Sequence, residues 1–334
     1  MLQFQKWRRN LNLNSMKYPK EIEQLHKEIE EIKIQGATNV AISTLKGIKV
    51  ALELDFPESE SLIDTVIDIG NYLAYARPNE PMAQNAVLYI QYLFDEKAIH
   101  RFPIEDEKKL IAQLCDDFLK EIEDEKQKIL EVNVPKLRQV DNVLTHCHSS
   151  TAVSLIKGIS QNDKDFTAVC TETRPRYQGR KTAVELLEAG IDTTLIADSA
   201  AESFVIGRGS QSVSTIFIGC DAITMEGYCI NKIGSWGIAM AAHESGKKLY
   251  VVTPLLKIDH DSAYHEIEIE IRENRELWKE APKNLKMYNP AFEVVDAQLI
   301  AGFITEFGIL KPKEISDVVR KEYPWLFYKK KYVM

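Results

Sequence analysis

The sequence predicts an α/β protein with a helical N-terminal domain, residues 1–135, followed by a doubly wound parallel-sheet domain, residues 136–334. Three observations lead to this prediction. The chain has 334 residues, enough for about two domains that each bury a core of their own. Apolar residues recur at three- and four-residue spacing up to about residue 130, which is a helical period. From about residue 140, short β-rich runs alternate with amphipathic stretches, as in parallel βαβ units.

Helices are expected throughout the N-terminal domain, at residues 20–34, 38–53, 60–76, 80–96 and 106–131. The last of these is the clearest, because its apolar side chains share one stripe and Asp, Glu and Lys occupy the opposite face. That stripe consists of Leu110, Leu114, Phe118, Ile122 and Ile129. The charges of the opposite face are interpreted as a solvated surface.

The C-terminal domain is expected to contain strands at residues 142–147, 166–172, 192–198, 215–220 and 248–254. Helices are expected between them at 149–160, 181–190 and 235–246, the last two ending at Gly190 and Gly246 as C-terminal caps. Ligands of open parallel sheets bind beyond the carboxyl ends of the strands. Functional residues are therefore expected at 145–150, 172–180, 198–200, 219–221 and 254–259.

Composition excludes several classes of protein. A net charge of −8 and a pI near 5.5 argue against nucleic-acid binding, which needs a basic face, but leave room for one small phosphate ester. No stretch approaches 18 uninterrupted apolar residues, so no membrane span is predicted. The first twenty residues are basic and lack a secretory apolar core; we expect a frayed N-terminus, with an organellar transit peptide as the alternative. Five cysteines without a CxxC pair predict a reduced, cytoplasmic protein.

Cys147 is a candidate reactive thiol. It lies in Thr-His-Cys-His-Ser-Ser at 145–150, where the first predicted strand ends and a helix begins, and a helix start stabilises a thiolate. Two alternatives stay open. Cys147 packs as a small hydrophobic residue, or it joins His146 and His148 in a metal site, although adjacent residues of a strand point to opposite faces. No metal ion or cofactor is predicted.

Two further strand ends carry polar residues. Asp221 follows a strongly apolar strand and is a candidate acid if a closed apolar pocket raises its pKa; the alternative is a turn or N-cap residue. The segment 172–180 has three arginines ahead of a helix, which suits either a phosphate or a solvated charged loop. Residues 231–234 add a cation and an amide at another helix start. No Walker loop and no G-x-G-x-x-G after a strand supports nucleotide hydrolysis or dinucleotide redox chemistry.

Taken together, these motifs resemble a family of sugar-phosphate isomerases. The family includes ribose-1,5-bisphosphate isomerase, methylthioribose-1-phosphate isomerase and the alpha, beta and delta regulatory subunits of translation initiation factor 2B. The resemblance covers residues 30 to 310 and follows ordered blocks: THCHSS at 145, ETRPRYQGR at 172, ADSA at 197, GCDAI with MEGYCINKIG from 219 to 234, VVTPLLKID at 251 and NPAFEVV at 289. It implies a Rossmann-like C-terminal domain.

The resemblance implies Cys147 and Asp221 as the catalytic pair. Because the regulatory subunits typically lack this pair, its presence favours an enzyme. The resemblance also implies contacts to substrate phosphate and sugar from Gly36, Ala37, Arg77, Gln178, Asn231 and Lys232. Two positions depart from the family pattern. Gln35 stands where the isomerases usually have arginine, which removes a guanidinium from the phosphate clamp, and His148 stands where they commonly have asparagine.

The predicted activity is therefore an aldose–ketose isomerisation of a ring-closed sugar 1-phosphate through an enol phosphate. Ribose 1,5-bisphosphate is preferred over methylthioribose 1-phosphate because of the helical N-terminal half and the short lead into the Gly-Ala motif. A Cys147 thiolate would remove the proton from carbon 2 and a protonated Asp221 would donate to the ring oxygen, with the roles exchangeable.

Two non-catalytic functions remain as alternatives: a regulatory subunit that binds a protein partner and no sugar phosphate, and a nucleotide sensor that uses the same pocket. The resemblance further implies a homo-oligomer, a dimer or hexamer. AMP is a candidate effector, and neither nucleic acid nor a membrane is an expected partner.

Overall fold

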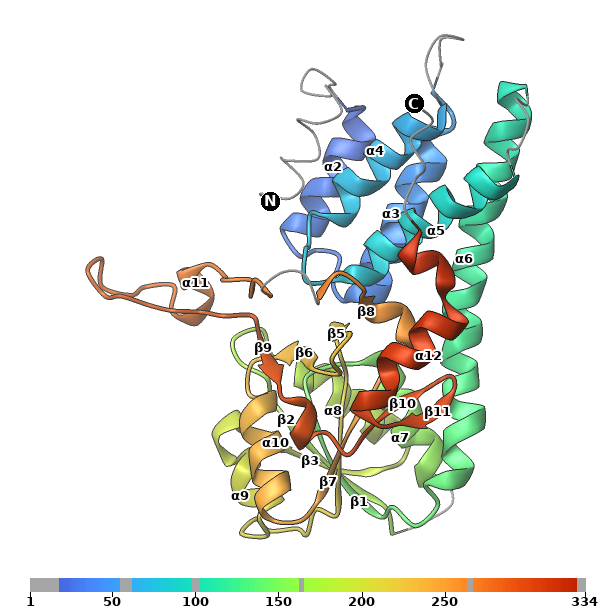
Figure 1. Ribbon diagram of the computed structural model, residues 1–334. Helices are drawn as coiled ribbons and strands as arrows, with labels where there is room; N and C mark the ends of the chain where they lie inside the picture. Colours follow the sequence, from blue (N-terminus) through green and yellow to red (C-terminus); the bar gives the residue numbers. More distant parts are fainter. Residues whose placement is uncertain (1–17, 55–61, 98–102, 162–164, 263–266, 329–334) are drawn as a thin grey trace. The chain divides into compact units, whose positions relative to one another are not determined.

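The computed structural model describes residues 18–54, 62–97, 103–161, 165–262 and 267–328 (Figure 1). The basic N-terminal segment and the transit-peptide alternative lie outside these residues. Contacts divide the chain into two compact units, one of Met1–Asp124 with Val319–Met334 and one of Glu125–Val318. The N-terminal unit is therefore discontinuous in sequence. The domain boundary expected at residue 135 stays a prediction.

The N-terminal unit is built from the helices that its apolar spacing predicts. They are α2 (Lys20–Glu30), α3 (Ala37–Ala51), α4 (Leu62–Ala74), α5 (Pro81–Lys97) and the first part of α6 (Ile104–Asn133). Along α3, Val40, Ala41, Leu45 and Ile48 repeat with helical spacing and are fully buried. No helix that the structure describes combines the length and hydrophobicity needed to cross a bilayer.

The C-terminal end of the chain returns to this unit, which the sequence did not predict. The last helix is α12 (Ile315–Glu322), and a 3₁₀ turn follows at Pro324–Phe327. There the Trp325 ring lies edge-on to Tyr89, with centroids 5.4 Å apart, and to Phe118 at 6.4 Å. Such aromatic pairs add to the free energy gained by burying the rings.

The C-terminal unit contains a seven-stranded sheet in the order β11-β10-β7-β4-β1-β2-β3. All its pairs are parallel except β10 with β11. Its strands are β1 (Asn142–His146), β2 (Thr167–Thr171), β3 (Asp192–Ile196), β4 (Thr215–Ile218), β7 (Lys248–Val252), β10 (Gly302–Thr305) and β11 (Gly308–Leu310). The helices α7 (Ser150–Ser160), α8 (Gln178–Glu188), α9 (Ala201–Val205) and α10 (Ser235–Glu244) connect them. This confirms the doubly wound parallel sheet.

The order of the strands locates the crevice of the sheet. From β1, the chain builds β2 and β3 on one side and then β4 and β7 on the other. Such a reversal opens a crevice beyond the carboxyl ends of the two strands that flank it, here β1 and β4. The register pairs His146 with Ile218, so these two strands end at the same level. Residues just after 146 and 218 are therefore brought to one edge.

A second, four-stranded sheet in this unit was not predicted. Its order is β8-β5-β6-β9, with β8 (Ile258–Asp259), β5 (Ala222–Thr224), β6 (Cys229–Lys232) and β9 (Phe292–Val295). Strands of two to four residues are too short to show a period in the sequence. Between β8 and β9 the chain forms the short helix α11 (Asn274–Leu277) and an isolated bridge between Ile271 and Pro290 (Figure 1).

Candidate active site

Cys147 and Asp221 follow the neighbouring strands β1 and β4. Cys147 is the first residue after β1 and Asp221 the third after β4, so both lie at the crevice. The two groups also interact electrostatically, because the negative charge of Asp221 contributes to raising the pKa of Cys147. The structure therefore brings the predicted catalytic pair to one place.

The backbone at Cys147 is held in a conformation that non-glycine residues rarely adopt, with φ of 69°. Two threonine hydroxyls fix it. The Cys147 N–H donates to Thr173 Oγ1 at 3.0 Å, and Thr182 Oγ1 donates to the Cys147 carbonyl at 2.8 Å. Left-handed backbone of this kind costs about 1–3 kcal/mol and persists only where its surroundings enforce it. Thr173, with φ of 63°, is itself in this region.

A chain of hydrogen bonds runs from Cys147 through buried side chains. Thr173 Oγ1 lies 3.3 Å from Thr171 Oγ1, which lies 2.7 Å from His146 Nδ1. His146 Nε2 lies 2.8 Å from the carbonyl oxygen of Ile233, which can only accept, so Nε2 carries the proton. Burial lowers the pKa of His146 and keeps the ring neutral, so Nδ1 accepts from Thr171. Each hydroxyl then donates in the same direction, from Cys147 toward Ile233.

His148 also supports the backbone turn at Cys147, through Thr182. Its Nδ1 lies 3.0 Å from Thr182 Oγ1, and because that hydroxyl donates to Cys147, it must accept from His148. Burial lowers the pKa of His148 as well. Both ring nitrogens of His146 are bonded within the protein, which leaves none for a metal ion. Among the described residues no group of three or more His, Cys, Asp or Glu side chains is arranged to hold one.

The expected thiolate at Cys147 is wrong for the ligand-free protein. Burial raises the pKa of the thiol to about 11, with the negative charge of Asp221 acting in the same direction. The positive charge of Lys232 lowers the pKa but does not outweigh burial. A backbone hydrogen bond from His148 also lowers the pKa without outweighing burial, and Ser149 caps the start of α7 by accepting the Ala152 N–H at 3.3 Å. The neutral thiol is therefore the resting form.

Asp221 is tied to the second sheet. Its N–H donates to the carbonyl of Ile230 on β6 at 2.9 Å, and its side chain is only partly buried, so the closed apolar pocket expected from the sequence is not observed. The neighbouring Cys220 carbonyl accepts from Lys257 Nζ at 2.6 Å. Lys257 is 8% exposed and lies in the segment 254–259, where functional residues were expected, but it was not singled out as a site residue. Its position between apolar residues, in Leu255-Leu256-Lys257-Ile258, could have indicated a buried lysine with a specific partner.

The three arginines of 172–180 do not converge on one point. Each guanidinium has its own internal partner: Arg174 the Tyr177 hydroxyl and the Leu277 carbonyl at 3.2 Å, Arg176 the Glu276 carboxylate at 3.1 Å, and Arg180 the Glu172 carboxylate at 2.8 Å. The charged-loop interpretation therefore describes Arg174 and Arg180. Arg176 also lines a pocket of the C-terminal unit.

Gln178 is the first residue of α8 and is partly exposed. The next residue, Gly179, lies so close to β2 that a Cβ would be 1.8 Å from the Thr171 carbonyl oxygen. Only glycine allows this approach, which brings the start of α8 against the end of β2. Gln178 is thereby held next to the Thr171–Thr173 segment that supports Cys147.

Asn231 and Lys232 end β6, and both are buried. Asn231 Nδ2 donates to Ser235 Oγ at 2.9 Å, and the Lys232 ammonium lies 4.7 Å from the centre of the Phe292 ring. The helix start beyond them is not open to a phosphate. Glu293 Oε1 accepts the N–H groups of Gly234 at 2.6 Å and of Trp236 at 2.8 Å, so a carboxylate of the protein already occupies it.

The remaining predicted contacts belong to the N-terminal unit. Gly36 has φ of 84° and precedes α3, which has no side-chain cap, and Ala37 is the buried first residue of that helix. Arg77 is buried and its guanidinium lies 3.0 Å from the equally buried Glu80. Gln35, which stands in place of the usual arginine, accepts a hydrogen bond from Asn39 Nδ2 at its backbone carbonyl, at 2.8 Å.

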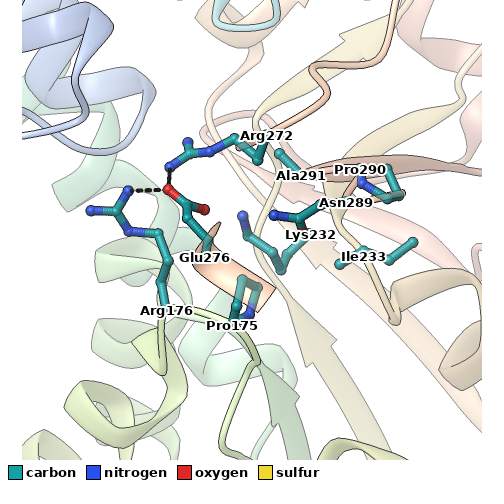
Figure 2. Close-up of a pocket in the computed structure, with 9 residues that line it drawn as sticks. All are labelled: Pro175, Arg176, Lys232, Ile233, Arg272, Glu276, Asn289, Pro290 and Ala291. Carbon is teal, nitrogen blue, oxygen red and sulfur yellow. Dashed lines mark hydrogen bonds and ion pairs between the residues drawn. The ribbon is translucent and has the colours of Figure 1, made fainter. Parts of the chain in front are cut away.

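One pocket of the C-terminal unit includes Lys232 (Figure 2). It holds about 210 Å³ of empty space and is lined by Pro175, Arg176, Lys232, Ile233, Arg272, Glu276, Asn289, Pro290 and Ala291. Neither Cys147 nor Asp221 is among these residues. Ile233 connects the two regions, because its carbonyl accepts the hydrogen bond from His146.

Comparison with known proteins agrees with this architecture. A sequence model described as "Initiation factor 2 subunit family" matches residues 33–312. The chain belongs to this family. A ribose 1,5-bisphosphate isomerase of Methanocaldococcus jannaschii is 32% identical over 309 residues, covering 91% of the chain and 96% of the relative. A methylthioribose-1-phosphate isomerase of Symbiobacterium thermophilum is 31% identical over 321 residues, covering 90% and 88%. These relatives support isomerase activity in this member of the family.

Several solved structures share the fold. A translation initiation factor eIF-2B of Pyrococcus horikoshii aligns with a TM-score of 0.74 at 24% identity, covering 88% of the chain and 98% of that structure. At this identity the likeness shows the fold alone. The 5-methylthioribose 1-phosphate isomerase of the same organism aligns with a TM-score of 0.71 at 25% identity, covering 91% and 87%.

Proposed function

We propose that the chain is a sugar-phosphate isomerase that converts ribose 1,5-bisphosphate to ribulose 1,5-bisphosphate. The observation that carries this proposal is the placement of Cys147 and Asp221 at the carboxyl ends of adjacent strands, with Cys147 in an enforced left-handed turn. Relatives with ribose 1,5-bisphosphate isomerase and methylthioribose-1-phosphate isomerase activity are about equally identical. Coverage favours the first, because the chain spans 96% of that relative and 88% of the second.

The reaction needs two proton-handling groups. A phosphate on the anomeric oxygen blocks simple ring opening, so the bond between carbon 1 and the ring oxygen must break while carbon 2 loses its proton. One group must take that proton and another must protonate the departing ring oxygen. Because burial raises the pKa of Cys147 to about 11, the thiol is protonated and suits the acid role. Asp221 then serves as the base, the reverse of the first assignment from sequence.

In this scheme the Asp221 carboxylate removes the proton from carbon 2, and that electron pair forms the double bond to carbon 1. The ring oxygen leaves carbon 1 and takes the Cys147 proton. The enol phosphate then returns to the ketose: its carbon 2 hydroxyl gives a proton to the Cys147 thiolate, and Asp221 returns its proton to carbon 1. Both groups end as they began. Lys232 limits the cost of the transient thiolate, because its positive charge lowers the pKa of Cys147.

The other predicted residues are proposed to bind substrate. Gly36, Ala37, Arg77 and Gln178 would contact the phosphate and sugar groups of the substrate, as the family resemblance implies. Asn231 and Lys232, the last two residues of β6, would also contact the phosphate and sugar groups of the substrate. The uncapped start of α3 supports the first of these assignments.

The test is incubation of the purified protein with ribose 1,5-bisphosphate or with methylthioribose 1-phosphate, with the ketose followed by NMR. Cys147→Ser and Asp221→Asn are each expected to reduce turnover by at least about 100-fold, the low end for general acid–base groups. Asp192→Asn, an exposed carboxylate on β3, serves as the control and should keep full activity. The proposal is contradicted if the wild-type protein does not convert ribose 1,5-bisphosphate. It is also contradicted if either site variant keeps full activity with an unchanged circular dichroism spectrum.

A homo-oligomer and an AMP effector belong to the same proposal. Light scattering on the purified chain tests the first, and a change in turnover on addition of AMP tests the second. A monomer in light scattering, or turnover unchanged by AMP, would remove the corresponding part.

A further inference from the structure

Two guanidinium groups converge on one carboxylate oxygen in the pocket beside Lys232. Arg176 Nη1 lies 3.1 Å and Arg272 Nη2 2.7 Å from the same Oε1 atom of Glu276 (Figure 2). The Arg272 side chain is 9% exposed and that of Glu276 21%, so water screens the pairing less than at an open surface. Paired guanidiniums around one oxyanion are the arrangement with which proteins hold phosphate.

A third cation lies in the same pocket. Lys232 is 8% exposed, and Figure 2 shows its side chain on the other side of Glu276 from Arg176. Among the described residues no carboxylate lies within 4.0 Å of its ammonium, which contacts the Phe292 ring. Arg272 has a second carboxylate partner, Glu270 at 3.0 Å, outside the pocket lining. Three cations therefore line a pocket that contains one carboxylate.

The Glu276 carboxylate belongs to a different segment of the chain from Arg176 and Lys232. Glu276 is in α11, a helix of four residues, whereas Arg176 precedes α8 and Lys232 ends β6. A helix this short has no stability of its own and depends on the contacts of its side chains. The backbone is held at both residues: the Arg272 N–H donates to the Asn289 carbonyl at 2.8 Å, and the Glu276 N–H donates to the Glu273 carbonyl at 3.0 Å. Displacement of the Glu276 carboxylate therefore needs only a rotation of its side chain.

The pocket is linked to the catalytic cysteine. Lys232 lowers the pKa of Cys147, and the Ile233 carbonyl accepts a hydrogen bond from His146, the residue before Cys147. Arg176 and Arg272 meet at a single oxygen of Glu276, which is the position that one phosphoryl oxygen would take.

We propose that Arg176, Arg272 and Lys232 form an anion subsite for the second phosphate of a bisphosphorylated sugar, and that Glu276 occupies it in the ligand-free protein. The inference rests on the proposed function and defines its substrate class. A phosphate with two negative charges displaces Glu276 and gains both guanidiniums. A neutral substituent at the same end of the sugar cannot replace the lost ion pairs, so the subsite discriminates against it.

The test measures binding rather than turnover. The Asp221→Asn chain is titrated with ribose 1,5-bisphosphate and with ribose 1-phosphate by isothermal titration calorimetry, alone and combined with Arg176→Met, Arg272→Met or Glu276→Gln. The two arginine variants should each weaken bisphosphate binding by about 10-fold or more, the value of a charge-assisted hydrogen bond, and change ribose 1-phosphate binding less than about 3-fold. Glu276→Gln should strengthen bisphosphate binding alone.

Arg275→Met is the matched control. This arginine is on the same short helix, is 76% exposed and pairs with Glu273 outside the pocket, so neither ligand should respond to its loss. Equal weakening of both ligands by the arginine variants overturns the subsite, as does a bisphosphate that binds no more tightly than ribose 1-phosphate. These outcomes are distinct from failure of the proposed function, which is absence of turnover of ribose 1,5-bisphosphate by the wild-type chain.

Discussion

The protonation state of Cys147 decides its role in catalysis and can be measured directly. Burial raises its pKa from the ordinary 9.0 to about 11. Two pKa units reduce the thiolate fraction at neutral pH about 100-fold, to roughly one molecule in ten thousand. Because only the thiolate reacts with iodoacetamide, the alkylation rate at Cys147 should rise about tenfold for each pH unit between 7 and 9.

The assay is timed iodoacetamide labelling followed by peptide mass spectrometry at Cys147, with circular dichroism recorded at each pH. Lys232→Met should slow labelling further, because the Lys232 charge lowers the pKa of the thiol. Lys181→Met, an exposed lysine on α8, should leave the rate unchanged. A rate that levels off below pH 9 would mean that the helix start outweighs burial. Cys147 would then be the base, and the assignment of acid and base given above would be reversed.

Three further predictions concern stability. In urea unfolding, Gly179→Ala should reduce the free energy of unfolding by about 3 kcal/mol, because its Cβ would lie 1.8 Å from a backbone oxygen. The comparison is Gly190→Ala, with φ of 81° and open space around it, which should cost about 1–2 kcal/mol. Equal costs would contradict the close approach of α8 to β2. Thr182→Val should cost about 1–3 kcal/mol and reduce turnover, because the partly buried Cys147 carbonyl loses its donor. Thr193→Val removes a partly buried hydroxyl at the start of β3 and is the comparison that should keep turnover. Burial raises the pKa of Cys115 and Cys170 from 9.0 to about 12, so the contribution of these thiols to stability is complete below pH 9 and is lost as pH rises toward 12. Cys170→Ala should therefore flatten the alkaline decline of the melting temperature in thermal melts. An unchanged slope would show that the Cys170 thiol titrates normally in the folded protein.

Periodicity was sufficient to predict the helices of the N-terminal unit and the parallel strands β1, β2, β3, β4 and β7. It did not predict the parallel strand β10. The stripe that includes Phe118 and Ile122 belongs to a single helix, and the runs at 142–147 and 215–220 are adjacent central strands. Rules for parallel sheets then placed Cys147 and Asp221 at one crevice. These predictions succeeded because helical and strand periodicity are each repeated over several residues of the sequence.

The parts that sequence could not predict depend on single contacts over long separations. Nothing near Arg176 in the sequence indicates Glu276, which is 100 residues away. The left-handed turn at Cys147 depends on hydroxyls of Thr173 and Thr182, 26 and 35 residues distant. The thiolate prediction failed for a related reason, since the desolvation that raises the pKa of Cys147 arises from tertiary packing.

The return of residues 319–334 to the N-terminal unit has a consequence for how the protein can be divided. The chain crosses between the compact units twice, at 124–125 and at 318–319. A fragment that ends at residue 124 would lack Trp325 and expose the surfaces of Tyr89 and Phe118 that this ring covers. An autonomous N-terminal fragment therefore needs the C-terminal peptide, supplied separately or joined by circular permutation. Removal of the last sixteen residues from the whole chain should therefore reduce the stability of the N-terminal unit, although most of that unit lies far from the cut in sequence.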